Sequence, residues 1–219
     1  RTMKKTGRYS TSNLVEDQFE PGSNGRVLRN LLGITSKREM DRIETAAYMH
    51  VTDKLIEEYD RGHRFTSSDI CYMHKQWLGS IYKWAGCYRN VMMNKRDFPF
   101  ASPAYIPRLM EDFERDILHQ YTPCTFDATE KVIEALATVH TELVLIHPFR
   151  EGNGRIARLL SVLMAFQAEL PYLDFSSIQR KKKEEYFAAV RAGLDRNYKP
   201  MEKVFSEVIS RTSKKYKQN

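Results

Sequence analysis

Apolar residues recur at helical spacing along most of the chain. Between Glu39 and Tyr59 they fall three or four positions apart, which predicts a helix with one face on the core. A short helix that starts at Ser68 or Asp69 as its N-cap and runs through Trp77 and Ile81 is predicted next. Further helices are predicted over Ile106–Tyr121, Thr125 or Asp127 to Ile146, Asn153–Ala168, Ser177–Leu194 and Pro200–Thr212. The stretch from Asn153 is apolar on several sides, so we expect it to lie centrally.

One segment departs from this period. Between Tyr88 and Pro103 apolar and polar residues alternate weakly, and Pro99 lies within the segment, which favours a short β-hairpin over a central strand. The first 36 residues are irregular and rich in turn formers. We therefore predict an all-α fold, a compact helical bundle with one small hairpin. Its expected parts are an irregular entry segment (1–36), a helical domain (37–212) and a basic tail (213–219).

Composition excludes several classes of protein. The chain has 219 residues and 42% hydrophobic content, enough for a packed core and unlike a disordered chain. Its longest apolar run, Leu159–Phe166, is far below the roughly 18 residues of a membrane span. Polar residues follow the basic N-terminus, so no secretory signal is predicted. Three scattered cysteines (Cys71, Cys87 and Cys124) indicate reduced thiols and a cytoplasmic protein.

Net charge narrows the partners only slightly. With 35 Lys and Arg against 28 Asp and Glu, the formal charge is +7, which favours nucleic acid, nucleotide phosphates or an acidic protein. Much of the excess lies in Lys181–Lys183 and in the C-terminal lysines, where a solvated surface is the ordinary interpretation. Charge alone therefore identifies no partner.

The segment from His147 to Arg158, with the sequence HPFREGNGRIAR, joins two apolar helices. Gly152 and Gly154 leave the backbone unobstructed, so a ligand can approach closely. The N–H groups of Asn153, Gly154 and Arg155 would be the unpaired donors of the next helix's first turn. Together with the helix dipole, these donors predict an anion-binding site.

The side chains of the segment add chemistry to this anion site. Arg155 and Arg158 are three residues apart on one helical face and suit a di- or triphosphate. Glu151 is a suitable oxygen ligand for Mg²⁺ that bridges phosphates. His147 can accept a proton from an attacking hydroxyl near neutral pH. Twelve residues thus contain a base, a metal ligand, an anion-binding site and two arginines that can bind phosphates. Phosphoryl or nucleotidyl transfer needs these four components.

Each feature alone has an ordinary explanation. A histidine that ends an apolar helix is usually structural, Gly-Asn-Gly is usually a turn, and arginines three apart usually pair on a surface. Their occurrence together favours function, because Arg155 and Arg158 belong to a helix whose other residues are apolar. Unpaired charge is costly there, and an anionic ligand would offset that cost.

The same segment resembles the signature of Fic-domain proteins, His-x-Phe-x-(Asp/Glu)-Gly-Asn-Gly-Arg-x-x-Arg, and matches every fixed position. The resemblance extends over about residues 8–210, through Pro21-Gly22-Ser23, Leu31–Ile34, Trp84-Ala85-Gly86, Tyr88-Arg89, Lys95 and Phe100-Ala101. It implies a Fic-type helical bundle with a β-hairpin flap, here residues 91–100. Most Fic proteins transfer AMP from ATP to a Ser, Thr or Tyr hydroxyl of a target protein. Kinase-like members replace the Gly-Asn-Gly part, which this sequence keeps.

Residue by residue, the resemblance implies the following roles. His147 would deprotonate the target hydroxyl, and Glu151 would hold Mg²⁺ between the α- and β-phosphates of ATP. Asn153, with the backbone at Gly152 and Gly154, would stabilise the α-phosphate, while Arg155 and Arg158 would bind the β- and γ-phosphates. Phe149 would anchor the loop from inside. Lys95 in the flap, Tyr186 and Asn197 are weaker candidates for nucleotide contacts.

Partners and regulation follow from the same resemblance. A target peptide would pair with the exposed strand edge of the flap. Many family members carry an inhibitory (Ser/Thr)-x-x-x-Glu-(Gly/Asn) motif whose glutamate pairs with the second arginine, here Arg158. The nearest match is Ser12 with Glu16, followed by Asp17 where Gly or Asn is expected, so we favour a separate small antitoxin, or no inhibitor. A bacterial cytoplasmic protein, or one delivered into a host cell, is expected.

Three alternatives remain at this point. A basic nucleic-acid-binding helical module would explain the charge, but the sequence lacks a helix-turn-helix or zinc-finger pattern. A metal hydrolase would need a second histidine at zinc-ligand spacing, which the segment lacks. The third is a Fic-type transferase that uses another nucleotide or phosphate donor.

Overall fold

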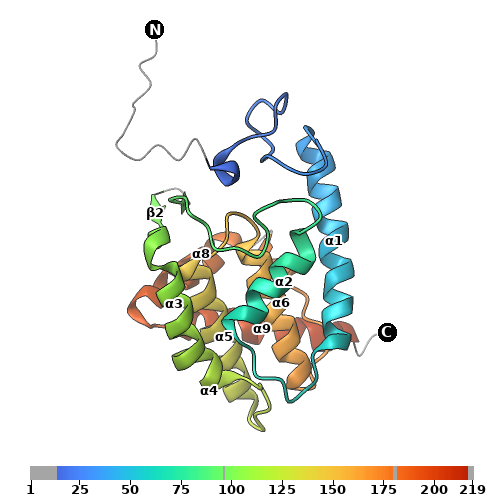
Figure 1. The fold of residues 1–219 in the computed structure, drawn as a ribbon. Helices are drawn as coiled ribbons and strands as arrows, with labels where there is room; N and C mark the ends of the chain where they lie inside the picture. The colour runs from blue at the N-terminus through green and yellow to red at the C-terminus, as the bar shows by residue number, and fades with distance from the viewer. Residues whose placement is uncertain (1–13, 96, 180–181, 217–219) are drawn as a thin grey trace.

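The long periodic stretches of the sequence fold into helices, which the computed structural model describes within residues 14–95, 97–179 and 182–216 (Figure 1). The helices are α1 (Lys37–Glu58), α2 (Ser67–Leu78), α3 (Ile106–Phe113), α4 (His119–Tyr121), α5 (Thr129–Ile146), α6 (Asn153–Gln167), α7 (Ser176–Gln179), α8 (Lys183–Ala192) and α9 (Lys199–Tyr216). Short 3-10 turns are η1 (Val15–Asp17), η2 (Pro103–Tyr105) and η4 (Gly193–Asp195). The all-α prediction with one small hairpin is confirmed.

Helices α5 and α6 form the centre of the bundle. Helix α5 packs against α6 and α9, with α3 and α8 also on its surface, whereas α1 and α2 pack on each other and on α6 (Figure 1). The predicted central position of α6 is confirmed, since its residues Ile156, Leu160 and Met164 are all fully buried. The loop between these two central helices therefore has packed elements on both sides.

The start of α2 differs from the prediction. Its N-cap is Thr66, not Ser68 or Asp69: the Thr66 hydroxyl accepts the Asp69 N–H (3.1 Å). In return, the Asp69 carboxylate accepts the Thr66 N–H (2.8 Å). This reciprocal capping box satisfies two backbone donors, so the helix begins at Ser67. Asp69 acts in the cap from the third helical position rather than as the cap itself.

Two predicted continuous helices are interrupted. The stretch from Ile106 to Tyr121 contains a π-helical segment, η3 (Glu114–Leu118), between α3 and α4. The stretch from Ser177 to Leu194 is divided into α7, α8 and η4. Conversely, α9 continues through residues 213–216, which the sequence placed in a basic tail. The amine of Lys215 there donates to the Asp174 carboxylate (2.9 Å), so a supposed tail lysine docks on the bundle.

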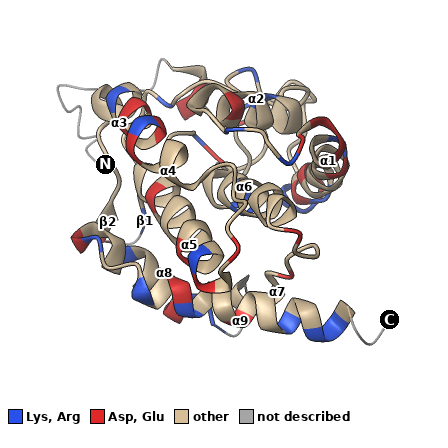
Figure 2. Ribbon diagram, turned by 90° about the horizontal axis from the view of Figure 1, so that it is seen from below, with Lys and Arg blue, Asp and Glu red and all other residues tan. Residues whose placement is uncertain are grey.

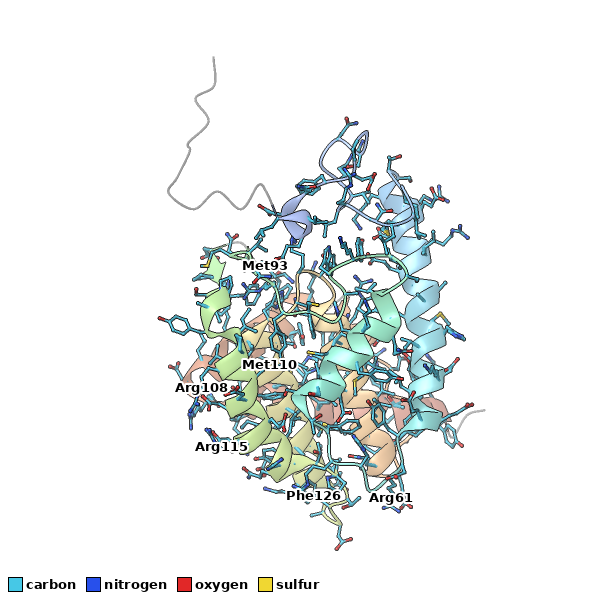
Figure 3. The ribbon with its side chains drawn as sticks, viewed as in Figure 1. Arg61, Met93, Arg108, Met110, Arg115 and Phe126 are labelled. Atoms are coloured by element: carbon cyan, nitrogen blue, oxygen red, sulfur yellow. The ribbon has the colours of Figure 1, made fainter. Side chains whose placement is uncertain are left out.

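The flap contains the two strands β1 (Asn94–Lys95) and β2 (Phe98–Pro99), which pair antiparallel with Asn94 opposite Pro99 and Lys95 opposite Phe98. The pair is extended by the Phe100 N–H, which donates to the Met93 carbonyl (3.0 Å). The hairpin lies above α3, at the end of the bundle that also carries the N-terminal segment (Figure 1), and Met93 marks its position in Figure 3.

Basic and acidic residues alternate along several of the described helices (Figure 2). On α3, for example, the Asp112 carboxylate forms ion pairs with Arg108 (3.2 Å) and with Arg115 of the π segment (2.8 Å). Both arginines point outward in Figure 3. This interleaving is typical of a solvated surface. Within the described ranges, no helix combines the length and the apolar character that a membrane span requires.

Candidate active site

The loop between α5 and α6 begins with an unusual backbone conformation. His147, the residue after α5, has φ 53° and ψ 58°, in the left-handed region that non-glycine residues rarely adopt. The buried guanidinium of Arg89 donates to the carbonyl of His147 (2.7 Å). It also donates to the carbonyls of Val91 (2.7 Å) and Ala101 (2.7 Å) beside the flap strands. One arginine therefore holds the strained loop and the base of the flap together.

Inside the loop, Asn153 binds the peptide groups of Phe149. Its side-chain oxygen accepts the Phe149 N–H (2.8 Å), and its amide nitrogen donates to the Phe149 carbonyl (2.7 Å). Asn153 is 3% exposed. This differs from the expectation that the Asn153 side chain stabilises a phosphate, because the amide is already used to close the loop. The inward position expected for Phe149 is confirmed, since it is fully buried.

A second buried histidine supports the loop from below. The imidazole of His74 on α2 stacks on the Phe149 ring, with centroids 3.9 Å apart and planes 6° from parallel. Its Nδ1 accepts the Gly86 N–H (2.8 Å), and its Nε2–H donates to the Glu151 carbonyl (3.0 Å). The loop is thus fixed by contacts at three successive points before α6 begins.

The two glycines of the loop meet different surroundings. Gly152 has φ +81°, and a Cβ there would lie 2.5 Å from the Trp77 ring, so only glycine fits. A Cβ on Gly154 would meet nothing closer than Nη1 of Arg158 at 3.6 Å. The fold therefore requires Gly152, whereas Gly154 leaves open space beside Arg158.

Helix α6 presents a free N-terminus to this space. Among the described residues, no side chain caps its first turn, and the first backbone bond is from the Ile156 N–H to the Gly152 carbonyl (2.9 Å). The N–H groups of Asn153, Gly154 and Arg155 are the ones that such a turn leaves without a partner in the helix. This is the anion site that the sequence predicts.

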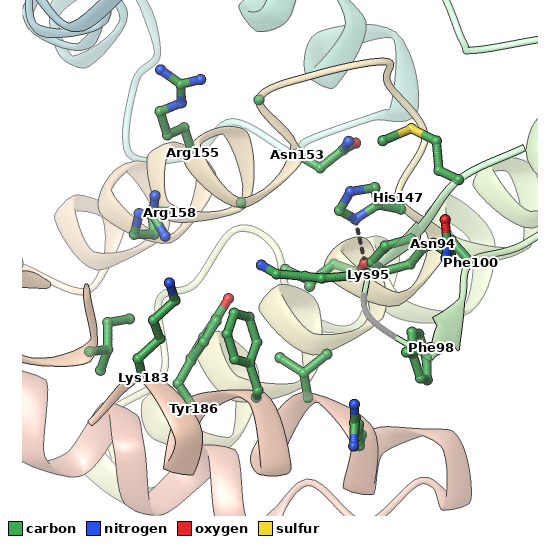
Figure 4. A pocket seen from close by; sticks show the side chains of 18 of the residues that line it. Asn94, Lys95, Phe98, Phe100, His147, Asn153, Arg155, Arg158, Lys183 and Tyr186 are labelled. Atoms are coloured by element: carbon green, nitrogen blue, oxygen red, sulfur yellow. Dashed lines mark hydrogen bonds between the residues drawn. The ribbon is translucent and has the colours of Figure 1, made fainter. Parts of the chain in front are cut away.

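A cavity of about 640 Å³ opens in front of that helix end (Figure 4). The loop and α6 form one wall, the flap a second and α8 a third. The predicted site residues that contribute to its lining are Lys95, His147, Glu151, Gly152, Asn153, Gly154, Arg155, Arg158 and Tyr186. Asn197 does not, since it lies after η4, where its side chain accepts the Lys199 N–H (3.3 Å).

The imidazole of His147 is held as a neutral base. Its Nδ1–H donates to the Val144 carbonyl (3.1 Å), the dashed line in Figure 4, so in the neutral ring Nε2 carries the lone pair. Phe100 of the flap covers one face of the ring. Burial, with the nearby charges of Arg89 and Lys95, lowers the pKa of His147 to about 4. At neutral pH this ring is therefore unprotonated and able to accept a proton.

The two arginines of the motif point in different directions (Figure 4). Arg155 pairs with the buried carboxylate of Glu44 on α1 (2.8 Å), and its guanidinium lies 4.4 Å from the centre of the Trp77 ring. Arg158 projects toward the cavity and makes no ion pair with an acid among the described residues. This differs from the expectation that both guanidinium groups face one phosphate chain. Glu44 lies 111 residues before Arg155 in the sequence, so no local pattern indicated this pair.

Lysines supply further positive charge. The amine of Lys95 lies 3.9 Å from the centre of the Phe187 ring on α8, and that of Lys183 lies 5.9 Å from the same ring. Lys183 belongs to the run that the sequence assigned to solvent, but it lines the cavity. The two residues before it are also lysines, so only the fold distinguishes it. Arg150, whose Nε donates to the Glu16 carbonyl (2.7 Å), is a further lining residue that sequence reasoning missed.

Glu151 is the single carboxylate of the motif. It is half-exposed, and its Oε1 accepts the Gly152 N–H (2.9 Å) and lies 3.4 Å from Nη2 of Arg155. Among the described residues, no group of three His, Cys, Asp or Glu side chains is placed to hold an ion by itself. One accessible carboxylate fits Mg²⁺, which proteins often bind through one or two carboxylates plus substrate phosphates and water.

The inhibitory motif suggested by the sequence is only partly described. Ser12 lies outside the described residues. The buried carboxylate of Glu16 accepts the Asn90 N–H (2.9 Å) instead of meeting Arg158. Glu16 therefore ties the N-terminal segment to the residues that precede the flap.

Comparison with known proteins agrees with this geometry. The sequence model of the Fic/DOC family matches residues 64–165. The chain is 30% identical over 189 residues to the probable protein adenylyltransferase Fic of Escherichia coli K12, covering 84% of this chain and 88% of that protein. It is 27% identical over 175 residues to the protein adenylyltransferase VbhT of Bartonella schoenbuchensis, covering 80% of this chain but only 35% of VbhT.

Solved structures share the fold at lower identity. The N-terminal Fic domain of a VirB-translocated effector from Bartonella sp. AR 15-3 has a TM-score of 0.74 at 24% identity, covering 92% of this chain and 95% of that one. The BepC protein of Bartonella tribocorum, solved with bound AMPPNP, has a TM-score of 0.70 at 20% identity, covering 90% and 97%.

Proposed function

This chain belongs to the Fic/DOC family, and from this premise we propose that it is a protein adenylyltransferase that transfers AMP from ATP to a hydroxyl of a target protein. The observation that carries the proposal is one cavity that holds a neutral imidazole, the free N-terminus of α6 and the guanidinium of Arg158. The names of the relatives, protein adenylyltransferases at 27–30% identity, support the same reaction.

The phosphate chain would lie along the start of α6. Backbone N–H groups of Asn153, Gly154 and Arg155 would bind the α-phosphate, because the first turn of α6 leaves them without a partner in the helix. Arg158 would bind the outer phosphates, with the lysine amines of the flap and α8 adding charge. We assign Arg155 a structural role, since its guanidinium already pairs with Glu44.

Glu151 would hold Mg²⁺ together with the phosphates. When bound, the ion supplies positive charge against the negative charge that builds up on the phosphates during transfer. The protein's own part is to keep the carboxylate at the cavity rim, which the Gly152 N–H does by fixing one of its oxygens.

In the transfer step, Nε2 of His147 would accept the proton of the target hydroxyl while the hydroxyl oxygen forms a bond to the α-phosphorus. The bond from that phosphorus to the bridging oxygen of the β-phosphate breaks, and pyrophosphate leaves. The Val144 carbonyl keeps Nδ1 protonated, so Nε2 is the nitrogen available for this proton. Arg89 holds the backbone of His147 in place while it happens.

The target would dock on the flap. An extended peptide can pair with an exposed strand edge through main-chain bonds, which brings a Ser, Thr or Tyr side chain toward His147. Exposed Met92 lies next to the strands and offers an apolar contact for the residues beside the acceptor.

A small inhibitor protein acting in trans is the form of regulation that we favour. Arg158 also lines a second groove, of about 950 Å³, which α6, the segment after it and α9 form, so an acidic side chain of a partner seated there could reach it. Glu16, the internal candidate, is bonded to Asn90. Glu16→Gly should therefore leave AMP transfer without a large rise, and a rise of tenfold or more would show that inhibition is internal.

The proposal is tested with Mg²⁺ and labelled ATP. Label at the α-phosphate should appear on the protein itself or on a partner in lysate, and His147→Ala should abolish it while ATP still binds. Label retained in that variant would remove the proposed base from the reaction. Label from the γ-phosphate alone would mean phosphorylation, and label from another nucleotide would identify a different donor.

A further inference from the structure

Arg150 lines the cavity but takes no part in the reaction above. Its side chain is half-buried, and its Nε donates to the carbonyl of Glu16 (2.7 Å). Among the described residues, no acidic side chain pairs with Arg150, and no group accepts a hydrogen bond from its Nη1 or Nη2. The guanidinium is therefore held at one nitrogen, and the other two are available to a ligand of the cavity.

The bond to Glu16 fixes the side of the cavity on which this guanidinium lies. Glu16 belongs to η1, and its carboxylate accepts the N–H of Asn90, which precedes the flap (2.9 Å). The N-terminal segment and the hairpin share one end of the bundle (Figure 1). Arg150 therefore lies where η1, the start of the flap and the loop of His147 meet. A target that docks on the flap approaches His147 from this side, whereas the proposed phosphate sites lie along α6.

The surroundings of this guanidinium favour an anionic partner. Val15 and Met92 are exposed apolar residues, one and two positions from the two residues that the Glu16–Asn90 bond joins. A protein segment that covers them would remove water from the guanidinium, and an ion pair is stronger where water is excluded. The Glu16 carboxylate does not compete for Arg150, because it is buried and bonded to Asn90. The free donors of an arginine form a fork that matches a carboxylate.

From this geometry we infer that Arg150 is a specificity residue for the target, whose guanidinium pairs with an Asp or Glu side chain close to the acceptor hydroxyl. The inference rests on the proposed function and adds to it the class of substrate, a hydroxyl flanked by an acid. Arg150 lies three residues after His147, so their Cα atoms are at most about 11 Å apart. An extended target segment covers that span in about three residues.

Mass spectrometry of AMP-bearing peptides tests this. The full chain, Mg²⁺ and ATP are incubated with bacterial and animal cell lysates. The residues around each modified hydroxyl are compared with those around unmodified Ser, Thr and Tyr of the same proteins. Asp and Glu should be enriched within about three positions of the acceptor. Arg150→Gln should remove that enrichment, and Arg150→Glu should replace it by enrichment of Lys and Arg, a reversal that loss of structure would not produce.

Kinetics on one acid-flanked target found in this way measures the size of the effect. Loss of a charge-assisted hydrogen bond predicts that Arg150→Gln lowers kcat/KM for that target about tenfold. Replacing the acidic residue of the target by its amide should lower kcat/KM by the same factor in the parent chain and have little further effect in the variant. Calorimetry on the His147→Ala chain should show the same ATP affinity with and without Arg150→Gln.

Arg26→Glu is the matched control, because it makes the same charge change at an exposed arginine outside the cavity lining. It should keep the acidic enrichment. Urea unfolding checks that each variant folds, and Arg150→Gln decides the result if Arg150→Glu does not fold.

Two results would overturn the inference and leave the proposed function standing. One is acidic enrichment that is absent with the parent chain or unchanged with Arg150→Gln. The other is tenfold weaker ATP binding in Arg150→Gln, which would assign Arg150 to the phosphates. Absence of any AMP-bearing peptide with the parent chain would overturn the proposed function and this inference together.

Discussion

The ring of Phe100 lies flat against the imidazole of His147, with centroids 3.7 Å apart and planes 11° from parallel. Phe100 comes from the flap, and His147 ends α5, so the flap removes water from one face of the proposed base. This contact explains part of the burial that depresses the pKa of His147.

The pH profile of AMP transfer should reflect this contact. A base is active when unprotonated, and the His147 pKa is lowered to about 4, so kcat/KM should stay level from pH 8 to about 5 and fall only below that. Phe100→Ala should expose the imidazole and raise its pKa toward 6.5, so the loss of activity in acid should begin at a higher pH. Phe126→Ala, before α5, should leave the pH of that loss unchanged. A parent profile that already falls near pH 6.5 would contradict the prediction.

Replacing either arginine of the motif by alanine should have a different effect: one replacement should lower stability and the other should weaken ATP binding. Arg155→Ala leaves the buried carboxylate of Glu44 without its cation, so it should lower the free energy of unfolding by about 3 kcal/mol. Arg158→Ala breaks no ion pair with a described residue and should change that free energy by less than about 0.5 kcal/mol. It should instead weaken ATP binding by tenfold or more. Urea unfolding and calorimetry separate the two losses, and equal stability loss in both variants would contradict the assignment.

Alanine substitutions at the two glycines of the loop form a second matched pair of variants. Gly152→Ala places a methyl 2.5 Å from Trp77 on a backbone at φ +81°, so it should destabilise the fold by a few kcal/mol. Gly154→Ala meets only ordinary contact and should fold normally. Its methyl enters the proposed phosphate space, so ATP affinity should fall. Thermal unfolding with and without ATP measures both effects, and a Gly154→Ala chain with full ATP affinity would place the phosphates elsewhere.

Stability should fall in mild acid because three histidines are buried without charge. Burial lowers the pKa of His74 and His147 to about 4 and that of His140 to about 3, below the value of about 6.5 in an unfolded chain. The unfolded state therefore binds more protons as pH falls below 6.5. Each histidine should lower the free energy of unfolding by on the order of 2 kcal/mol between pH 6.5 and 5.

Urea unfolding at several pH values measures this loss. His140→Phe should reduce the slope of stability against pH by about a third within that window, since one of the three groups is removed. His50→Gln, at an exposed position on α1, should leave the slope unchanged. A parent slope that is flat from pH 7 to 5 would contradict the prediction.

Much of the fold follows from apolar spacing alone. The period of 3.6 residues locates α1, α5, α6 and α9 within a few positions, because these helices bury a continuous face. Their ends are less predictable. Helix α2 begins at a reciprocal bond between Thr66 and Asp69, and the π segment from Glu114 interrupts an otherwise regular apolar stripe.

The candidate site was predictable where the chemistry lies in one short segment. His147, Glu151 and Arg158 are recognisable by residue type and spacing, and the structure brings them to one cavity. The residues that orient these side chains or cover them come from distant segments of the chain. Glu44 decides where Arg155 points, and Phe100 covers His147. Such pairings depend on tertiary packing, which local sequence patterns do not encode.

The three bonds of Arg89 have a consequence for how target choice can evolve. Since one guanidinium joins the carbonyl of His147 to those on either side of the flap strands, the flap and the proposed base are held together as one part. Sequence changes that shift the flap would also displace His147. If targets dock on the flap as proposed, new targets are gained most easily by exchanging exposed side chains such as Met92, with the backbone of the flap left where it is.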